Sequence, residues 1–288
     1  MKFGIVLPSY GSHVDRNQIL ETAQTADALN FDSAWLTDHL ALPMQEAGRF
    51  ATIYEAIASM AFIAGKTQKI KVGTSTLVLP QRNPLEVAKQ IATLDALSQG
   101  RVLLTCAIGW SPGEYANLGF EFNNRARRIE ETIYILRLLW SSKEAVSYTG
   151  KYYQFHDVMI SPPPHQPGGP PIWMAGDSMA AIRRAARLGD GWHPNSRKAQ
   201  QLQQEIKVIH SLNQNQGFII AMRCRMNFDA QPVDDMPLYG PIDKVQIAMR
   251  EYAEIGLNYL MIHFDCPDQK VRENQMRQFQ VEVAPNFL

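Results

Sequence analysis

The chain has 288 residues, 45% of them hydrophobic, and its 28 Lys and Arg residues balance its 28 Asp and Glu residues. This composition is typical of a globular protein with a sizeable core, and zero net charge excludes an overall field that attracts nucleic acid or anionic membranes. No apolar run approaches the roughly 18–20 residues of a membrane-spanning helix. The N-terminal segment predicts a first strand and not a signal peptide. The three cysteines are far apart, so we expect reduced thiols, no metal site and a cytoplasmic protein.

Strand-like and helix-like segments alternate along the chain. The predicted strands are 3–7, 33–37, 70–79, 101–109, 172–176, 191–194, 218–228 and 259–264. Amphipathic spacing predicts a helix after almost every strand. The first helix begins near Asp15, the second carries Ile53 to Ala64, and the third runs from Asn83 to Gly100. The fourth carries Ile129 to Trp140, the fifth ends near Gly189, and the last two cover 198–213 and 242–255.

Residues 145–171 interrupt the alternation. Their first part alternates like a hairpin, and "SPPPHQPGGPP" is an extended connector. Eight apolar strands covered by helices favour parallel pairing and predict a (β/α)₈ TIM barrel of the α/β class. We therefore expect one domain, 1–288, with a hairpin and proline-rich insertion at about 145–171, after the fourth βα unit. A doubly wound open sheet is the alternative, but no G-x-G-x-x-G follows the first strand.

Reactive groups of such barrels lie where the strands end, at their carboxyl edge. The residues at these ends are Leu7-Pro8-Ser9, Thr37-Asp38-His39, Thr74-Ser75-Thr76, Ile108-Gly109-Trp110, Gly176-Asp177-Ser178 and His193-Pro194-Asn195-Ser196. Asp38 and His39 together suggest proton exchange, although a capping Asp beside a structural His is an equal alternative. "MAGDS" suggests a phosphate site where a helix begins, although a tight turn with a Ser or Asp cap explains it equally well.

Several longer segments resemble the luciferase-like monooxygenases, a superfamily of flavin- and deazaflavin-dependent barrel enzymes. The resemblance covers roughly residues 1–195 in "TDHLALP", "KVGTSTLVLPQRNPLEVAKQIATLDALSQGRV", "GWSPGEYANLGFEFNNRARRIEE", "YTGKYYQF" and "PPIWMAGDSMAAIRRAARLGDGWHP". Within the superfamily it is most similar to the branch that uses coenzyme F420, with users of FMN as near relatives. The resemblance implies a reduced F420 or FMN, with F420 favoured, and a small organic substrate.

The resemblance also assigns roles to the residues at the strand ends. It implies that Asp38 and His39 lie beside the cofactor ring, with His39 as proton donor or orienting group, because imidazole exchanges protons near neutral pH. Asp38 is then expected either to hold the tautomer of His39 or to bond the edge of the ring. It implies a non-proline cis peptide at Ser75–Thr76 behind the ring. The expected cofactor contacts are Thr74, Ser75, Thr76, Gly176, Asp177, Ser178, Asn195 and Ser196, and Trp110 and Glu114 are expected in the substrate pocket.

One position departs from the family pattern. The deazaflavin-dependent sugar-phosphate dehydrogenases carry a catalytic Glu directly after G-x-G, where this chain has Trp110, so the resemblance disfavours sugar-phosphate oxidation. Hydride transfer with F420 and monooxygenation with FMN both stay open, as does a non-catalytic flavin-binding relative. An aldolase-like barrel is disfavoured because no Lys stands at a strand end. The resemblance further implies a homodimer, and a separate reductase as a possible partner.

Overall fold

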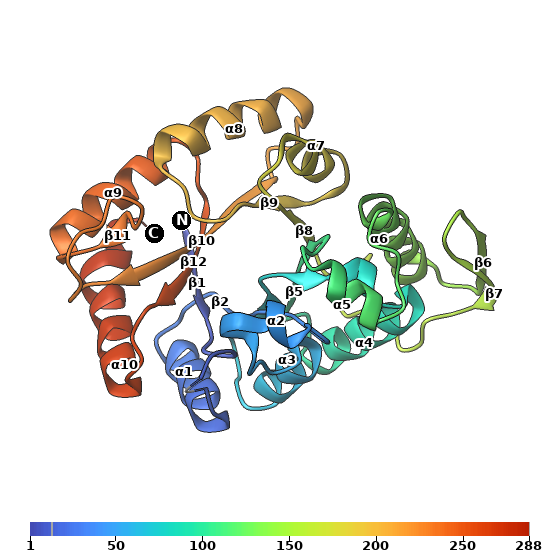
Figure 1. Cartoon of the computed structure of the whole chain (residues 1–288), viewed down its shortest axis with the longest axis horizontal. Helices are drawn as coiled ribbons and strands as arrows, with labels where there is room; N and C mark the ends of the chain where they lie inside the picture. The colour runs from blue at the N-terminus through green and yellow to red at the C-terminus, as the bar shows by residue number, and fades with distance from the viewer. Residues whose placement is uncertain (13, 288) are drawn as a thin grey trace.

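Within residues 1–12 and 14–287, which the structure describes, eight parallel strands close into the barrel that the sequence predicts. The structure is a computed structural model, and each strand pairs with the next in chain order until the last pairs with the first (Figure 1). The strands are β1 (Lys2–Val6), β2 (Ser33–Leu36), β3 (Lys71–Thr74), β5 (Val102–Ala107), β8 (Ile172–Ala175), β9 (Gly191–His193), β10 (Ile219–Asn227) and β12 (Tyr259–Phe264).

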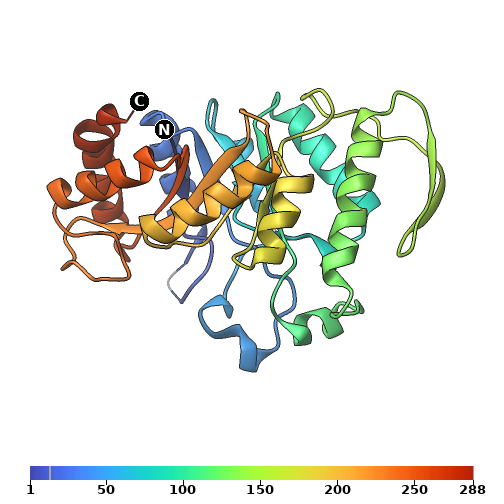
Figure 2. The ribbon, with the colours of Figure 1, turned by 90° about the horizontal axis from the view of Figure 1, so that it is seen from above.

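Helices cover the outside of the barrel, as the sequence predicts. They are α1 (Arg16–Ala28), α3 (Ala56–Ala64), α4 (Pro84–Leu97), α6 (Arg125–Ser141), α7 (Met179–Leu188), α8 (Ala199–Leu212), α9 (Ile242–Glu254) and α10 (Gln269–Gln278). Two shorter helices, α2 (Met44–Ala47) and α5 (Pro112–Asn117), lie in loops at the carboxyl edge of the barrel. Figure 2 shows them side by side at one end, in blue and green, and their loops share a hydrogen bond from Asn117 Nδ2 to Ala41 O, at 2.9 Å.

Two predicted boundaries need correction. The predicted strand 70–79 is two pieces, β3 and β4 (Leu77–Val78), because the chain turns at Ser75–Thr76 before β4 pairs with β5. Ile53 does not belong to the second predicted helix, because that helix, α3, begins at Ala56. It is extended and bridges to Tyr10, and Glu55 caps the helix by accepting from the N–H of Ala58 at 2.6 Å.

The barrel interior is filled by large aromatic side chains. Trp35, Trp173 and Tyr259 pack against one another inside the barrel, with ring centroids 5.0 to 6.0 Å apart. Gly4 and Gly73 give Trp35 its space, because a Cβ would lie 2.3 Å from the Trp35 Nε1 atom at Gly4 and 2.5 Å from Trp35 Cζ3 at Gly73. The barrel is therefore closed below its carboxyl edge, and a ligand has access only from the rim.

The insertion after the fourth βα unit is present as predicted. Its strands β6 (Val146–Thr149) and β7 (Gln154–Val158) form an antiparallel hairpin that projects from the barrel beside α6 (Figure 1). A further short strand, β11 (Leu238–Tyr239), extends the sheet next to β10. None of the helices in the described part of the chain combines the length and the apolar character that crossing a bilayer requires.

Candidate active site

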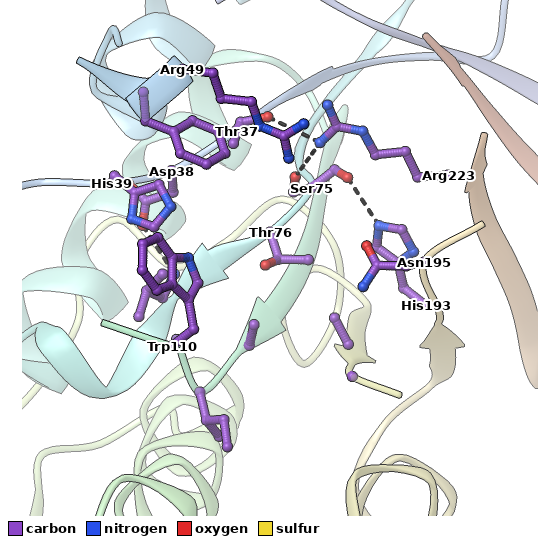
Figure 3. Close-up of a pocket in the computed structure, with 17 residues that line it drawn as sticks. Thr37, Asp38, His39, Arg49, Ser75, Thr76, Trp110, His193, Asn195 and Arg223 are labelled. Atoms are coloured by element: carbon purple, nitrogen blue, oxygen red, sulfur yellow. Dashed lines mark hydrogen bonds between the residues drawn. The ribbon is translucent and has the colours of Figure 1, made fainter. Parts of the chain in front are cut away.

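A pocket of about 400 Å³ opens at the carboxyl edge of the barrel strands. Its lining includes seven of the residues that the sequence predicts at the site: Asp38, His39, Ser75, Thr76, Trp110, Gly176 and Asn195. Figure 3 shows His39 and Trp110 on one side of this pocket and His193 and Asn195 on the other, with Thr76 between them. Residues from five loops or strand ends therefore converge, as the barrel topology requires.

The break between β3 and β4 forms the floor of the pocket. The peptide bond between Ser75 and Thr76 is cis, as the resemblance implies. Thr74, the last residue of β3, does not line the pocket. Its hydroxyl donates to the carbonyl of Thr105 on β5 at 2.9 Å, and it is buried within the sheet. Thr74 thus fixes the strand end and leaves Ser75 and Thr76 to face the ligand space.

The imidazole of His39 is held from behind by a carboxylate. His39 Nδ1 lies 2.9 Å from Glu114 Oε2, and both side chains are almost fully buried. Glu114 also accepts from the N–H groups of Leu40 and Ala41 at 2.6 and 3.1 Å, and from Gln81 Nε2 at 3.2 Å. Burial raises the pKa of Glu114, but the hydrogen bonds from His39 and the two N–H groups outweigh it and lower that pKa.

These contacts determine which nitrogen of His39 carries the proton. Because Glu114 is ionised, it only accepts, so Nδ1 of His39 is the donor. No described residue bonds the other nitrogen, Nε2, and His39 lines the pocket. The ring is fixed further by Phe50 and Trp110, whose centroids lie 4.7 and 5.6 Å away. Nε2 is therefore the His39 nitrogen that faces a ligand.

Glu114 does not lie in the substrate pocket, where the sequence predicts it. It belongs to α5, which Ser111 caps by accepting from the N–H of Glu114 at 2.9 Å, with Pro112 in the first turn. The Ser-x-x-Glu spacing is that of a capping box, in which the Glu turns back to its own helix start. Here the carboxylate contacts the loop after β2 instead, so Glu114 supports His39 and does not line the pocket.

Asp38 is committed to the backbone and to an arginine and does not hold His39. Its Oδ2 accepts from the N–H of Val78 at 2.9 Å, and its Oδ1 accepts from Arg82 Nη2 at 2.7 Å. Burial raises the pKa of Asp38, and the Arg82 guanidinium opposes this shift. The predicted role of Asp38 as the partner that sets the tautomer of His39 is wrong, because Glu114 occupies that place. Asp38 joins β2 to β4 at the pocket floor.

Ser75 connects the floor to the opposite wall. His193 Nδ1 lies 3.0 and 3.1 Å from the carbonyls of Pro194 and Ala221, so Nδ1 carries the proton, and Nε2 accepts from the hydroxyl of Ser75 at 2.9 Å. Burial and the Arg223 guanidinium lower the pKa of His193 to about 4. At neutral pH this histidine is therefore an uncharged hydrogen-bond partner.

The segment predicted to bind phosphate is organised by ion pairs. Gly176 lines the pocket, but Asp177 is bound by Arg197 and by Asn195, whose Nδ2 donates to Asp177 Oδ2 at 2.6 Å. Ser178 caps α7 by accepting from the N–H of Ala181. Ser196 lies 3.3 Å from the sulfur of Cys224. Asp177, Ser178 and Ser196 are thus exposed and do not line the pocket, and their contacts shape the loops that carry Gly176 and Asn195.

Among the polar and aromatic side chains that line the pocket, Arg49, Phe50 and Arg223 were not predicted, and His193 was named only as a strand-end residue without a role. Arg223 had a signal, because an arginine within the apolar strand "FIIAMRCRMNF" is unusual unless it serves a site. His193 stands at a strand end, where the barrel rule places it. Arg49 and Phe50 follow α2, and only the folded loop brings them over the pocket.

The closed parallel barrel with a polar pocket at its carboxyl edge defines a (β/α)₈-barrel enzyme. Residues 1–217 match the family of luciferase-like monooxygenases, and the chain belongs to that family.

Individual relatives agree with this assignment. Over 93% of its own length and 94% of the relative's, the chain is 35% identical to a protein of Amycolatopsis mediterranei (strain U-32) named F420-dependent glucose-6-phosphate dehydrogenase. The monooxygenase RslO1 of Streptomyces bottropensis has the same fold, with a TM-score of 0.85 at 21% identity over 100% of both chains. The F420-dependent tetrahydromethanopterin reductase of Methanopyrus kandleri matches with a TM-score of 0.82 at 18% identity, over 100% of this chain and 99% of its own.

Proposed function

We propose that the protein transfers a hydride between coenzyme F420 and a small organic alcohol or carbonyl compound, with His39 exchanging the proton at the substrate oxygen. Family membership and the 35% identical F420-dependent relative support the broader statement that the chain is an F420- or flavin-dependent oxidoreductase. The observation that carries the proposal is the His39–Glu114 pair, because it prepares one imidazole nitrogen for proton exchange beside the pocket floor.

The residues around the pocket fit a flat ring with a phosphate-bearing tail. Gly109 and Gly176 line it with positive φ angles of 69° and 135°, and a Cβ would lie 2.6 Å from Val78 Cγ1 at Gly109 and 2.7 Å from Ala181 Cβ at Gly176. These glycines keep the wall open on both sides of the Ser75–Thr76 floor. We assign the ring to this floor and the phosphate to the edge at Gly176, where α7 begins.

His39 acts on the proton and Glu114 acts on His39. When bound, F420 supplies the two-electron hydride acceptor or donor. With F420 held at the Ser75–Thr76 floor as the hydride acceptor, Nε2 of His39 would take the hydroxyl proton of an alcohol substrate. Glu114 stabilises the resulting imidazolium through the bond at Nδ1. In the direction of carbonyl reduction the same nitrogen returns the proton.

The proposal does not include glucose-6-phosphate, the substrate in the name of the Amycolatopsis relative. The resemblance places a Glu of the sugar-phosphate dehydrogenases where this chain has Trp110, and Trp110 is 51% exposed at the pocket. Glu114 does not replace the missing acid, because its two oxygens are already bonded by His39, Gln81 and two backbone N–H groups. A substrate that needs only one proton-exchanging group, His39, fits this pocket.

Cofactor binding is the direct test. The purified protein is titrated with F420 and with FMN while ligand fluorescence is followed, and turnover of alcohols is measured from the absorbance of F420. We expect tight binding of F420 and weak binding of FMN. Tight binding of FMN alone would indicate monooxygenation instead, and F420 binding without turnover of any alcohol or ketone would indicate the non-catalytic relative. Binding of neither cofactor would contradict the proposed function.

Three expectations, the single domain from the sequence pattern and the homodimer and reductase from the resemblance, stay predictions. We propose that residues 1–288 form a single domain, which limited proteolysis measures as one protected fragment. The homodimer is tested by light scattering in solution. A reductase partner is required for FMN chemistry and for carbonyl reduction with F420, because both consume reduced cofactor, so the direction of turnover decides whether to search for it.

A further inference from the structure

Two arginines at the pocket have no acidic partner. Within residues 1–12 and 14–287, neither Arg49 nor Arg223 takes part in an ion pair with a carboxylate. Asp38, the only acid that lines the pocket in that part of the chain, is bound to Arg82. The pocket therefore carries positive charge that no acidic side chain at its wall neutralises, although the whole chain has zero net charge.

The two guanidinium groups lie together. Figure 3 shows them pointing toward one another above Ser75, and both lie over the ring of Tyr10, with their Cζ atoms 5.9 and 5.8 Å from its centroid. Arg223 donates only to uncharged oxygens: Thr37 Oγ1 at 3.1 Å, the carbonyl of Ser75 at 3.0 Å and the Tyr10 hydroxyl at 2.9 Å. These bonds fix the direction of Arg223 without compensating its charge.

Neighbouring groups respond to this positive potential. Burial lowers the pKa of Arg223, and Arg49 lowers it further. The pKa of His263 lies well below its ordinary value because the residue is buried and because Arg223, Arg225, Arg272 and Arg49 repel a proton on its ring. A like-charged pair at the wall of a pocket is unfavourable unless an anion lies between its members.

We propose that Arg49 and Arg223 together bind an oxyanion, a carboxylate or phosphate, that belongs to the substrate. Guanidinium groups present paired N–H donors that match the oxygens of such groups. The substrate is thus an alcohol or carbonyl compound with an anionic group a short distance from the carbon that reacts, since Phe50 contacts both His39 and the Arg49 guanidinium, with Cζ 4.9 Å from its ring centroid.

The cofactor is a second possible source of an oxyanion. This assignment to the substrate rests on the proposed function, in which the cofactor phosphate binds at Gly176, at the start of α7. Gly176 follows β8, whereas Arg49 follows α2 and Arg223 lies on β10. Arg223 also lies beyond residues 1–217, the part of the chain that matches the family. Arg49 lies within that part.

Anion binding is measured by thermal unfolding with inorganic phosphate and with acetate, against potassium chloride at matched ionic strength. The titration is repeated with F420 at saturation, so that the cofactor's own phosphate site is filled. We expect a saturable rise of Tm in both series. Arg49 is exposed, and its side chain makes no hydrogen bond to another described residue. Arg49→Gln should therefore weaken the phosphate response about tenfold or more while leaving the affinity for F420 within about twofold.

Arg16→Gln is the matched control. Arg16 is exposed and lies over Phe62, with Cζ 5.3 Å from the ring centroid, so it resembles Arg49 in setting but is outside this pocket. Its phosphate response should equal that of the unmodified protein. Arg223→Lys provides a second variant that keeps a charge but loses the paired donors, and it should also weaken the response.

Three results would overturn the proposal. The first is the absence of a saturable phosphate or acetate effect. The second is an equal response in Arg49→Gln and Arg16→Gln. The third is an Arg49→Gln protein that loses affinity for F420 while its phosphate response is unchanged, because the pair then serves the cofactor. A protein that binds phosphate as expected but neither F420 nor FMN would contradict the proposed function and leave the oxyanion site in place.

Discussion

His39 and Glu114 are 75 positions apart in the chain, and their Nδ1 and Oε2 atoms lie 2.9 Å apart. His39 lies in the loop after β2 and Glu114 in the first turn of α5, which follows β5, so the loops of two barrel strands separated by β3 meet behind the pocket. Arg82 and Asp38 form a second contact of this kind at the pocket floor. His39, the proposed proton-exchanging group, is thus held by a carboxylate that does not line the pocket.

Replacing His39 tests its role in proton exchange. His39→Asn removes Nε2 as the base, so we expect kcat to fall about 10²- to 10⁴-fold, with F420 affinity nearly unchanged. His156→Asn, on the exposed face of the β6–β7 hairpin, is the matched control and should retain full activity. Steady-state kinetics and cofactor titration measure the two effects. If the His39→Asn enzyme keeps its activity, a group other than His39 exchanges the proton.

Replacing Glu114 separates orientation from chemistry. Glu114→Gln leaves one of the donors around this side chain without an acceptor. We therefore expect kcat to fall about tenfold or more while KM changes little, and the free energy of unfolding to fall by about 1–3 kcal/mol. The pKa of Glu114 is lowered in the folded state. Its contribution is therefore present above the pKa of a free glutamate and is lost as the pH falls through the lower, folded value.

Urea unfolding at several pH values measures the Glu114 effect. The stability gap between the two proteins should be full at pH 7 and should close below about pH 4. A gap that stays constant with pH would show that the bonds of Glu114 do not depend on its charge. Glu121→Gln, an exposed acid in the segment between α5 and α6, controls for the loss of a negative charge.

Trp110 is expected to determine substrate choice and not stability. Its side chain is 51% exposed, and its ring meets that of His39 at 5.6 Å in an edge-on arrangement. Trp110→Ala should change KM for different alcohols unequally, while the free energy of unfolding changes by about 0.5 kcal/mol or less. A uniform loss of kcat with unchanged KM would instead assign Trp110 to the positioning of His39.

His193 makes the free energy of unfolding depend on pH below neutrality. Its pKa is about 4 in the folded protein, below that of a free histidine near 6.5, so the unfolded chain binds the proton more readily. The contribution of His193 to the free energy of unfolding is about 3 kcal/mol. It is fully present above about pH 6.5 and is lost as the pH falls toward 4. His193→Gln should lose less stability over this interval than the unmodified protein.

Thermal unfolding from pH 7 to pH 4 measures this slope. His210→Gln on the exposed face of α8 is the control and should follow the unmodified protein. Equal slopes for His193→Gln and the unmodified protein would place the acid sensitivity elsewhere, with buried His263 as the next group to replace.

The barrel could be predicted because each strand is short, apolar and followed by an amphipathic helix. Strand ends then placed His39, Ser75 and Thr76 at the rim without any knowledge of tertiary contacts. The partner of His39 could not be predicted in this way. Adjacent Asp38 was the local choice, but the N–H of Val78 and the guanidinium of Arg82 take its two oxygens.

Glu114 was placed in the pocket because its loop follows a strand. Whether a side chain on such a loop faces the ligand or the neighbouring loop depends on how α5 packs, and no periodicity records that. Arg49 was missed for the same reason. Asp177 and Ser178 show the opposite case, in which the local alternative of a tight, capped turn describes the structure of the segment well.

Arg223 donates to Thr37 and to the carbonyl of Ser75 across 186 and 148 positions of the chain. Bonds between residues so far apart form only after most of the chain is in place, because closing long loops costs entropy that later contacts must recover. The pocket is therefore a property of the completed ring of strands and of no smaller fragment. Ligand occupancy should for that reason protect the whole barrel from unfolding as one unit, and a protein truncated before β10 should bind nothing.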